Sequence, residues 1–340
     1  MSITIFADEE QRALEEKTTL PRFLFFPLCV LGFVLIATSW PVDHWAVRAG
    51  WILFTSYWMF CWMSCFHETA HQTLCGSRTF SIWLGRFLGT AMWVPYTTYR
   101  ESHIRHHAYL NKPTDWELWP YCDPDVPLWF RRVFVWVDLL LGFVTAPAIY
   151  GRTFFHRNSP IRSKQLRRKI VWEYVGIAVG WGTIIGFVAW YDKWMGLLLV
   201  WIAPHWLAGI WQNARKLTEH LGMASYDPLQ GTRTVLGENW FTRLCTFLNF
   251  DIFVHGPHHR HPRLAHDRLR QKMVEYADEN PDTPYPLFKS YWRATLAGIP
   301  WMVRNPGVGM NVGAPSPEME KDTDVRNFVG DVNVEILADS

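Results

Sequence analysis

Four long apolar stretches, arranged as two close pairs, constrain the fold of this chain more than any other feature. The first pair covers 23–40 and 46–66, and the second covers 171–190 and 194–211. Each stretch approaches the roughly 20 apolar residues that a helix needs to cross a bilayer. Because each pair is joined by only a few residues, we expect two antiparallel helical hairpins. Both turns then lie on one side of a membrane, and the remaining polar chain lies on the other.

Basic residues indicate which side the polar chain occupies. Seven lysines and arginines fall between 151 and 170, whereas the two short turns carry almost none. Positive residues near membrane spans favour the cytoplasmic side. The 21 tryptophans suit a protein with two membrane interfaces. We therefore predict a multi-pass integral membrane protein with its polar part, and any active site, on the cytoplasmic side.

The predicted fold is all-α, with four transmembrane helices in two hairpins and a cytosolic helical cap. Two further apolar stretches, 82–96 and 133–150, are short or interrupted, and we interpret them as helices at the interface or within the cap. The expected organisation is a cytosolic N-terminal segment (1–22), a membrane domain (23–270), a cytosolic helical segment (271–314) and a mobile acidic tail (315–340). A net charge of +2 gives no case for nucleic-acid binding. The six cysteines include no CxxC pair, so we expect reduced, structural cysteines rather than a disulfide framework.

Nine of the fourteen histidines fall into four tight groups. These groups are His67 and His71; His103, His106 and His107; His220; and His255, His258 and His259. On a helix, residues three or four apart share a face, so each multiple group can present its rings toward one centre. Imidazole is a common ligand of iron, copper, zinc and nickel.

The groups also occupy matching places along the chain. The first begins where the second apolar stretch ends, and the third lies beyond the fourth stretch, while the others follow each hairpin. All nine histidines are therefore predicted to meet above the cytoplasmic surface as metal ligands. Nine ligands are too many for one ion, so we expect two. A pair of iron ions (Fe2+/Fe3+) with open positions can use O2 as co-substrate to attack a strong C–H bond.

Several polar residues near these groups are candidates for orienting the rings from outside. They are Glu68, Glu101, Asn213, Glu219 and Asp251. Carboxylates commonly accept the second N–H of a metal-bound imidazole. The alternative is that these acids are solvated surface groups. The other histidines are not predicted to be ligands, and they are His44, His156, His205, His261 and His266.

Two other classes of protein remain as alternatives at this point. The residues 67–71 also match the HExxH pattern of zinc metalloproteases, in which the glutamate is the general base. Such a protease needs one further ligand and leaves the other clustered histidines without a role. A haem protein or metal carrier would instead place its histidines inside the spans.

The pattern resembles the membrane fatty acid desaturase superfamily, with HxxxH at 67–71 and HxxHH at 103–107 and 255–259. The resemblance implies a four-span, mushroom-shaped helical fold, a di-iron centre and an apolar tunnel for substrate. Two features depart from acyl-CoA desaturases. Lys216 stands where they have an asparagine four residues before the histidine, and Glu219–Gly222 is similar to the corresponding box of alkane hydroxylases.

We therefore predict an O2-dependent di-iron oxidoreductase that desaturates a fatty or lipid acyl chain. The alternative is a hydroxylase or ketolase of an alkane, carotenoid or other apolar lipid, because hydroxyl rebound competes with a second hydrogen abstraction. Electrons are expected from a separate protein, either a ferredoxin or a cytochrome b5-like carrier with its reductase.

Overall fold

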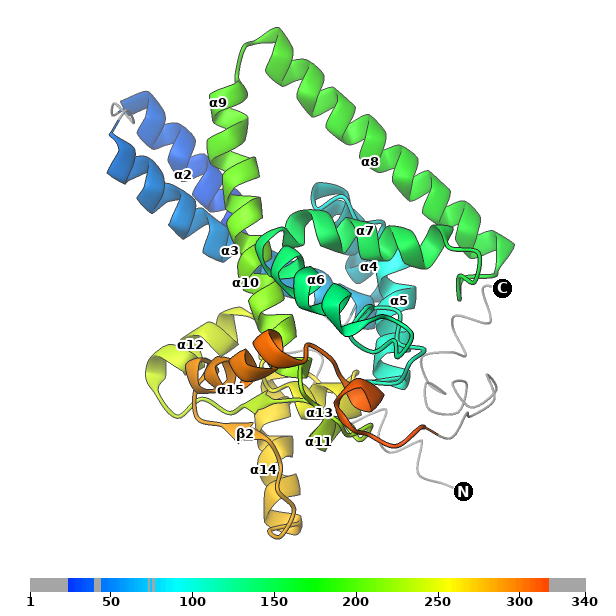
Figure 1. The fold of residues 1–340 in the computed structure, drawn as a ribbon. Coiled ribbons are helices and arrows are strands. Elements are labelled where there is room, and N and C mark those ends of the chain that lie inside the picture. The colour runs from blue at the N-terminus through cyan, green and yellow to red at the C-terminus, as the bar shows by residue number, and fades with distance from the viewer. Residues whose placement is uncertain (1–23, 40–43, 73, 75–76, 318–340) are drawn as a thin grey trace.

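The computed structural model describes residues 24–39, 44–72, 74 and 77–317. The predicted segment 1–22 and most of the predicted acidic tail lie outside these residues. The described chain is almost entirely helical (Figure 1). In chain order the main helices are α2 (Phe25–Ser39), α3 (Trp45–His71), α4 (Arg78–Ala91), α5 (Tyr96–Ala108), α6 (Leu128–Leu140), α7 (Gly142–Phe155), α8 (Lys164–Trp190), α9 (Trp194–Leu197), η3 (Leu198–Ile202), α10 (Ala203–His220), α11 (Pro228–Gly231), α12 (Trp240–Leu248), α13 (His255–Arg260), η4 (His266–Arg268), α14 (Leu269–Glu279), α15 (Tyr291–Arg304) and η5 (Gly309–Val312).

Strand structure within the described residues is limited to one short parallel pair. The strands β1 (Thr234–Val235) and β2 (Leu287–Phe288) are two residues long, and they pair Thr234 with Leu287. The mainly helical character of the predicted fold is confirmed.

The second predicted hairpin consists of two long apolar helices. One is α8, and the other runs continuously through α9, η3 and α10 from Trp194 to His220. Both are long and apolar enough to cross a bilayer. The side chains of α8 are largely exposed, as expected where a helix faces lipid rather than protein. The two helices diverge from their shared turn (Figure 1).

The first predicted hairpin also forms two neighbouring helices, but they differ from a standard spanning pair. The helix α2 has 15 residues, or about 22 Å at the usual helical rise, which is less than the hydrocarbon core of a bilayer. Its partner α3 has 27 residues, but its second half is buried in protein and ends at His71. The described residues thus contain two helices that are long and apolar enough to cross a membrane, or three spans if α6 and α7 together form one bent span. The four-span arrangement stays a prediction.

The apolar stretch predicted at 133–150 forms two helices, α6 and α7, which are bent by 120° relative to each other. A buried aspartate, Asp138, ties this bend to α10. Its carboxylate accepts hydrogen bonds from Thr145 (2.7 Å) and Tyr121 (3.0 Å), and it pairs with Lys216 (2.7 Å). Gly142 and Gly209 allow α7 and α10 to approach, since a Cβ on Gly142 would lie 2.7 Å from the Gly209 carbonyl oxygen.

The main core forms around the second half of α3. Met59, Phe60, Phe66 and Leu88 are buried there, and the Phe66 ring stacks on Tyr99 with centroids 4.3 Å apart. The helix α10 packs along α3 and continues into the cap, which contains α11 to α15 (Figure 1). The C-terminal ends of α3, α5 and α10 meet α13 at the junction between the long apolar helices and the cap.

Candidate metal centre

All nine predicted histidines lie at this meeting point, and every one is buried. The end of α3 supplies two of them, α5 supplies three, α10 ends on His220, and α13 supplies the last three. Their convergence depends on where the helices stop. After His220 the chain must turn sharply at Gly222, which has φ +83°, and a Cβ there would overlap the Trp301 ring. The glycine of this box therefore has a conformational role.

The nine rings form two groups. The first contains five histidines, His67, His71, His103, His107 and His258, and the second contains four, His106, His220, His255 and His259. Within each group, one nitrogen from each ring lies within 4.8 Å of all the others. We call these the five-histidine group and the four-histidine group.

Helical spacing explains how two HxxHH boxes serve both groups. His103 and His107 are four residues apart and join the five-histidine group, whereas His106 points into the other. In α13 the assignment is reversed, because His255 and His259 join the four-histidine group and His258 joins the other. Two rings on one helical face and a third rotated from it can thus ligate two neighbouring ions.

The inward atoms are Nε2 nitrogens at the separation expected for ligands of one ion. The Nε2 of His103 lies 3.1 Å from that of His71 and 3.1 Å from that of His107. The Nε2 of His255 lies 2.9 Å from that of His220 and 3.0 Å from that of His259. Two nitrogens bound at right angles to one ion lie about 3 Å apart.

Two further features fit a metal centre. The Nε2 atoms of His67 and His258 are buried and have no hydrogen-bond partner among the described residues. A buried polar atom without a partner destabilises a fold, and a bound metal ion would supply that partner here. Burial, followed by neighbouring histidines, lowers the pKa of His107, His258 and His259 well below the usual value. These three rings therefore favour the neutral form, in which a ring nitrogen has a lone pair free for a metal.

Carboxylates contact the outward nitrogens of three rings. The Nδ1 atom of His106 lies 2.7 Å from Asp115, that of His103 lies 3.0 Å from Glu117, and that of His67 lies 3.2 Å from Glu68. Tyr150 donates a hydrogen bond to the other oxygen of Glu117. These contacts fix ring orientation and direct Nε2 inward.

Sequence reasoning missed two of these carboxylates. Asp115 and Glu117 lie in the turn after α5, eight and ten residues beyond His107. Asp115 also accepts the backbone N–H groups of Glu117 and Leu118, which holds this turn against the histidines. The available signal was the Asp-Trp-Glu sequence at 115–117, which follows the second histidine box by more than two helical turns.

The other residues predicted to orient the histidine rings do not contact an outward Nδ1 atom of the nine histidines. Glu219 pairs with Arg215 and approaches His255. Glu101 is buried and pairs with Arg100, Asn213 donates to Asp138, and Asp251 contacts His266. The histidines predicted not to be ligands lie outside both groups, and His261, for example, contacts the Tyr276 hydroxyl at 2.6 Å.

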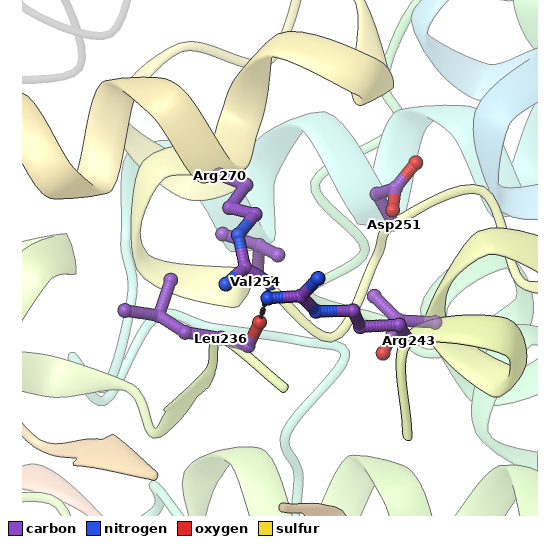
Figure 2. Close-up of a pocket in the computed structure, with 6 residues that line it drawn as sticks. Leu236, Arg243, Asp251, Val254 and Arg270 are labelled. Atoms are coloured by element: carbon purple, nitrogen blue, oxygen red, sulfur yellow. Dashed lines mark hydrogen bonds between the residues drawn. The ribbon is translucent and has the colours of Figure 1, made fainter. Parts of the chain in front are cut away.

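Two cavities lie near this region. A small one of about 80 Å³ is lined by histidines of both groups and by polar side chains, including Tyr150 and Lys216. A second of about 250 Å³ lies outside the histidine groups and is lined by Arg243, Arg270 and Asp251 (Figure 2). In it, Arg270 donates to the backbone of Leu236. Of these two cavities, only the first is lined by histidines of the two groups.

Replacing Asp115 with asparagine or Glu117 with glutamine is expected to lower activity or metal affinity about 10- to 100-fold. The substituted amide keeps the side-chain volume but no longer offers a charged acceptor to the Nδ1–H of His106 or His103. Metal titration and turnover of the purified variants measure this effect. Asp125→Asn, in an exposed part of the same connection, is the control. Wild-type affinity and turnover in both variants would contradict the orienting role.

Comparison with known proteins adds a family relationship to this geometry. A family model described as fatty acid desaturase matches residues 43–292. The sn-1 acyl-lipid omega-3 desaturase (ferredoxin) of Synechocystis sp. is 24% identical in an alignment 347 positions long, which covers 89% of this chain and 91% of that protein. A protein of the same name from Nostoc sp. is 21% identical, with 83% of each chain covered.

A chloroplastic relative matches over a shorter region. The chloroplastic omega-6 fatty acid desaturase of Glycine max is 24% identical over 63% of this chain. The chain spans about half the length of that protein, at 54%. All three relatives carry the name of a desaturase rather than a hydroxylase or a protease.

Proposed function

This chain belongs to the fatty acid desaturase family, and we propose from that premise that its two histidine groups hold two iron ions. The protein is an oxidoreductase that desaturates a fatty acyl chain. The single observation that carries the iron assignment is the pair of adjacent, buried, all-imidazole groups described above. Neither group includes a cysteine, which argues against a closed structural zinc site.

The chemistry that iron supplies is the reduction of O2 to an oxidant able to remove hydrogen from an aliphatic chain. In a balanced turnover, two hydrogen atoms leave adjacent carbons and O2 takes up two electrons and two protons, which gives a double bond and two waters. The residues of this chain bind the ions, fix the rings and exclude bulk water. Burial of all nine histidines serves the last purpose.

We propose five ligands for one ion and four for the other, as the two groups divide them. Glu68, Asp115 and Glu117 would hold the imidazoles of His67, His106 and His103 through their outer nitrogens. The small cavity beside both groups has room for molecules of the size of water or O2.

The proposed substrate is an acyl chain carried on a membrane lipid. The relatives from Synechocystis and Nostoc are named acyl-lipid desaturases. The exposed apolar surface of α8, which includes Val179, Ile184 and Phe187, indicates contact with lipid. We propose that α2, α3, α8 and α9–α10 form the two hairpins predicted from the sequence.

The proposed orientation places the histidine groups on the cytoplasmic side. The basic stretch at 151–170 supports it, since positive residues near spans favour that side. Arg152 lies in this stretch, and its guanidinium carbon is 4.5 Å from the ring centroid of Trp116 and 4.4 Å from that of Trp119. The electron donor we propose is a ferredoxin, because two relatives are named as ferredoxin-dependent.

Lipid analysis of cells that express the protein tests this function. Cells with the wild-type chain are expected to gain a double bond in a lipid acyl chain, and cells with His258→Ala are not. An added oxygen in place of the double bond would favour hydroxylation. New peptide fragments without a lipid change would favour the protease alternative and contradict the proposal.

A further inference from the structure

One carboxylate approaches the metal-facing side of the histidine groups rather than their outer side. The Oε2 atom of Glu219 lies 3.5 Å from Nε2 of His255. That nitrogen is the one that converges with the Nε2 atoms of His220 and His259. By contrast, Glu68, Asp115 and Glu117 contact Nδ1 atoms, which face away from the groups.

From this contrast we infer that Glu219 is a carboxylate ligand of the ion in the four-histidine group. The inference rests on the proposed function and adds a tenth protein ligand to it. Two ligand atoms at about 2.1 Å from one ion are separated by about 3.0 to 3.5 Å when the angle between them lies near 90 to 110°. The separation between Glu219 and His255 falls in this range.

The numbers of histidines in the two groups support the same assignment. One group offers five imidazoles and the other offers four. A carboxylate oxygen from Glu219 would give the second ion five protein donors as well, after a movement of its side chain, since this oxygen is not among the atoms of that group that lie within 4.8 Å of one another. Iron accepts carboxylate together with imidazole, as in sites with two histidines and one carboxylate.

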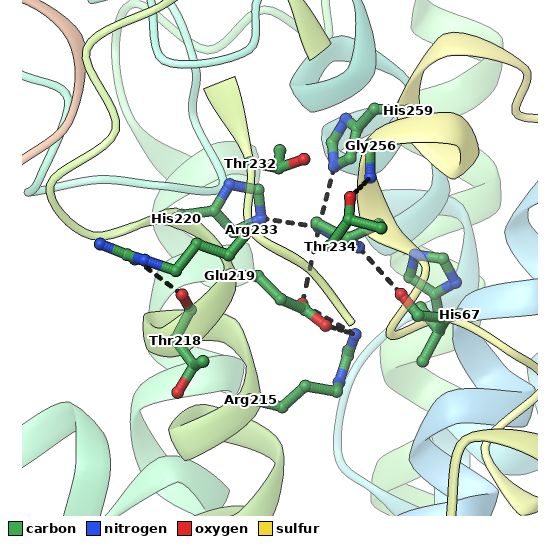
Figure 3. Close-up of polar contacts among 12 residues, drawn as sticks. His67, Arg215, Thr218, Glu219, His220, Thr232, Arg233, Thr234, Gly256 and His259 are labelled. Atoms are coloured by element: carbon green, nitrogen blue, oxygen red, sulfur yellow. Dashed lines mark hydrogen bonds and ion pairs between the residues drawn. The ribbon is translucent and has the colours of Figure 1, made fainter. Parts of the chain in front are cut away.

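The position of Arg215 is consistent with a ligating carboxylate. Its Nη1 lies 3.2 and 3.0 Å from the two oxygens of Glu219 (Figure 3). The arginine is 3% exposed and the glutamate 2%. A buried arginine at these distances holds the carboxylate in place and leaves its remaining lone pairs free for a metal.

The test is Mössbauer spectroscopy of 57Fe-loaded wild-type protein beside Glu219→Gln. We expect the signal of one iron to shift in the variant while the signal of the other stays unchanged. After a chelator challenge, the variant should retain about one iron where the wild-type chain retains about two. The matched control is Glu101→Gln, the same substitution at another buried glutamate paired with an arginine, and it should keep both signals.

A second variant protects the test against misfolding. Glu219→Gln alone leaves the Arg215 charge buried and uncompensated, which is destabilising. The double variant Glu219→Gln and Arg215→Gln removes both charges and should show the same one-site change. A structure of the iron-loaded wild-type protein gives an independent measurement, with a Glu219 oxygen expected about 2.1 Å from one ion.

The outcomes separate this inference from the proposed function. A wild-type protein with about two irons, whose spectrum is unchanged in the single and double variants, overturns the Glu219 assignment alone. A carboxylate more than about 3 Å from either ion in the iron-loaded structure does the same. A wild-type protein that binds no iron overturns the proposed function, and the assignment falls with it.

Discussion

Replacing His107 or His258 with alanine is expected to abolish double-bond formation and to leave membrane insertion intact. Both rings belong to the five-histidine group and come from different helices, α5 and α13. Alanine removes a ligand outright, so the loss should exceed the roughly 10- to 100-fold effect of removing an outer hydrogen-bond partner. Insertion depends on the apolar helices, which neither substitution changes.

The measurement compares acyl-chain composition and membrane-fraction protein for each variant. His261→Ala is the matched control, because His261 lies two residues after His259 but contacts Tyr276 and belongs to neither group. This control should desaturate at close to the wild-type rate. Retained activity in both His107→Ala and His258→Ala would remove the ligand assignment.

Replacing Asp138 with alanine is expected to destabilise the fold by about 3–5 kcal/mol. The substitution leaves Lys216 without its partner at 2.7 Å and removes the acceptor of Tyr121 and Thr145. Asp138 is fully buried, so water cannot replace these contacts. Equilibrium unfolding in denaturant, followed by tryptophan fluorescence of the detergent-solubilised protein, measures the change in the free energy of unfolding.

The double variant Asp138→Ala and Lys216→Met is the control for the charge. It leaves no unpaired ammonium group near the bend between α6 and α7, so it should recover part of the lost stability. If the free energy of unfolding of the single variant Asp138→Ala lies within about 1 kcal/mol of the wild-type value, the Asp138–Lys216 pair contributes no more than a surface ion pair. The bend would then depend on other contacts.

The sequence predicted the location of the histidine groups because their spacing encodes local geometry. HxxxH and HxxHH fix which rings share a helical face, and their placement after each apolar pair fixes where those faces lie. The structure brings the same nine residues together. Their division into five and four could not be predicted, since it depends on how α5 and α13 are rotated against each other.

The outer contacts were harder to predict, because they join residues through tertiary packing rather than through helical spacing. Asp115 reaches His106 across a turn, and Asn213 binds Asp138 instead of a histidine. Asp138 is a single acidic residue within the apolar stretch 133–150, so the sequence gives no sign of its partners. In the fold it is the residue that connects α6 and α7 to α10.

The membrane arrangement was only partly predictable from apolar length. The stretches at 171–190 and 194–211 form helices that pass as spans, whereas the stretch at 23–40 forms a helix of 15 residues. The stretch at 46–66 continues to His71 and buries its second half against protein. Hydrophobicity alone does not distinguish burial in lipid from burial in a protein core.

Metal analysis of the purified wild-type chain tests the central claim most directly. The two histidine groups predict about two irons per chain. A content of about one zinc per chain with no iron would contradict this account and return the HExxH alternative at 67–71 to consideration.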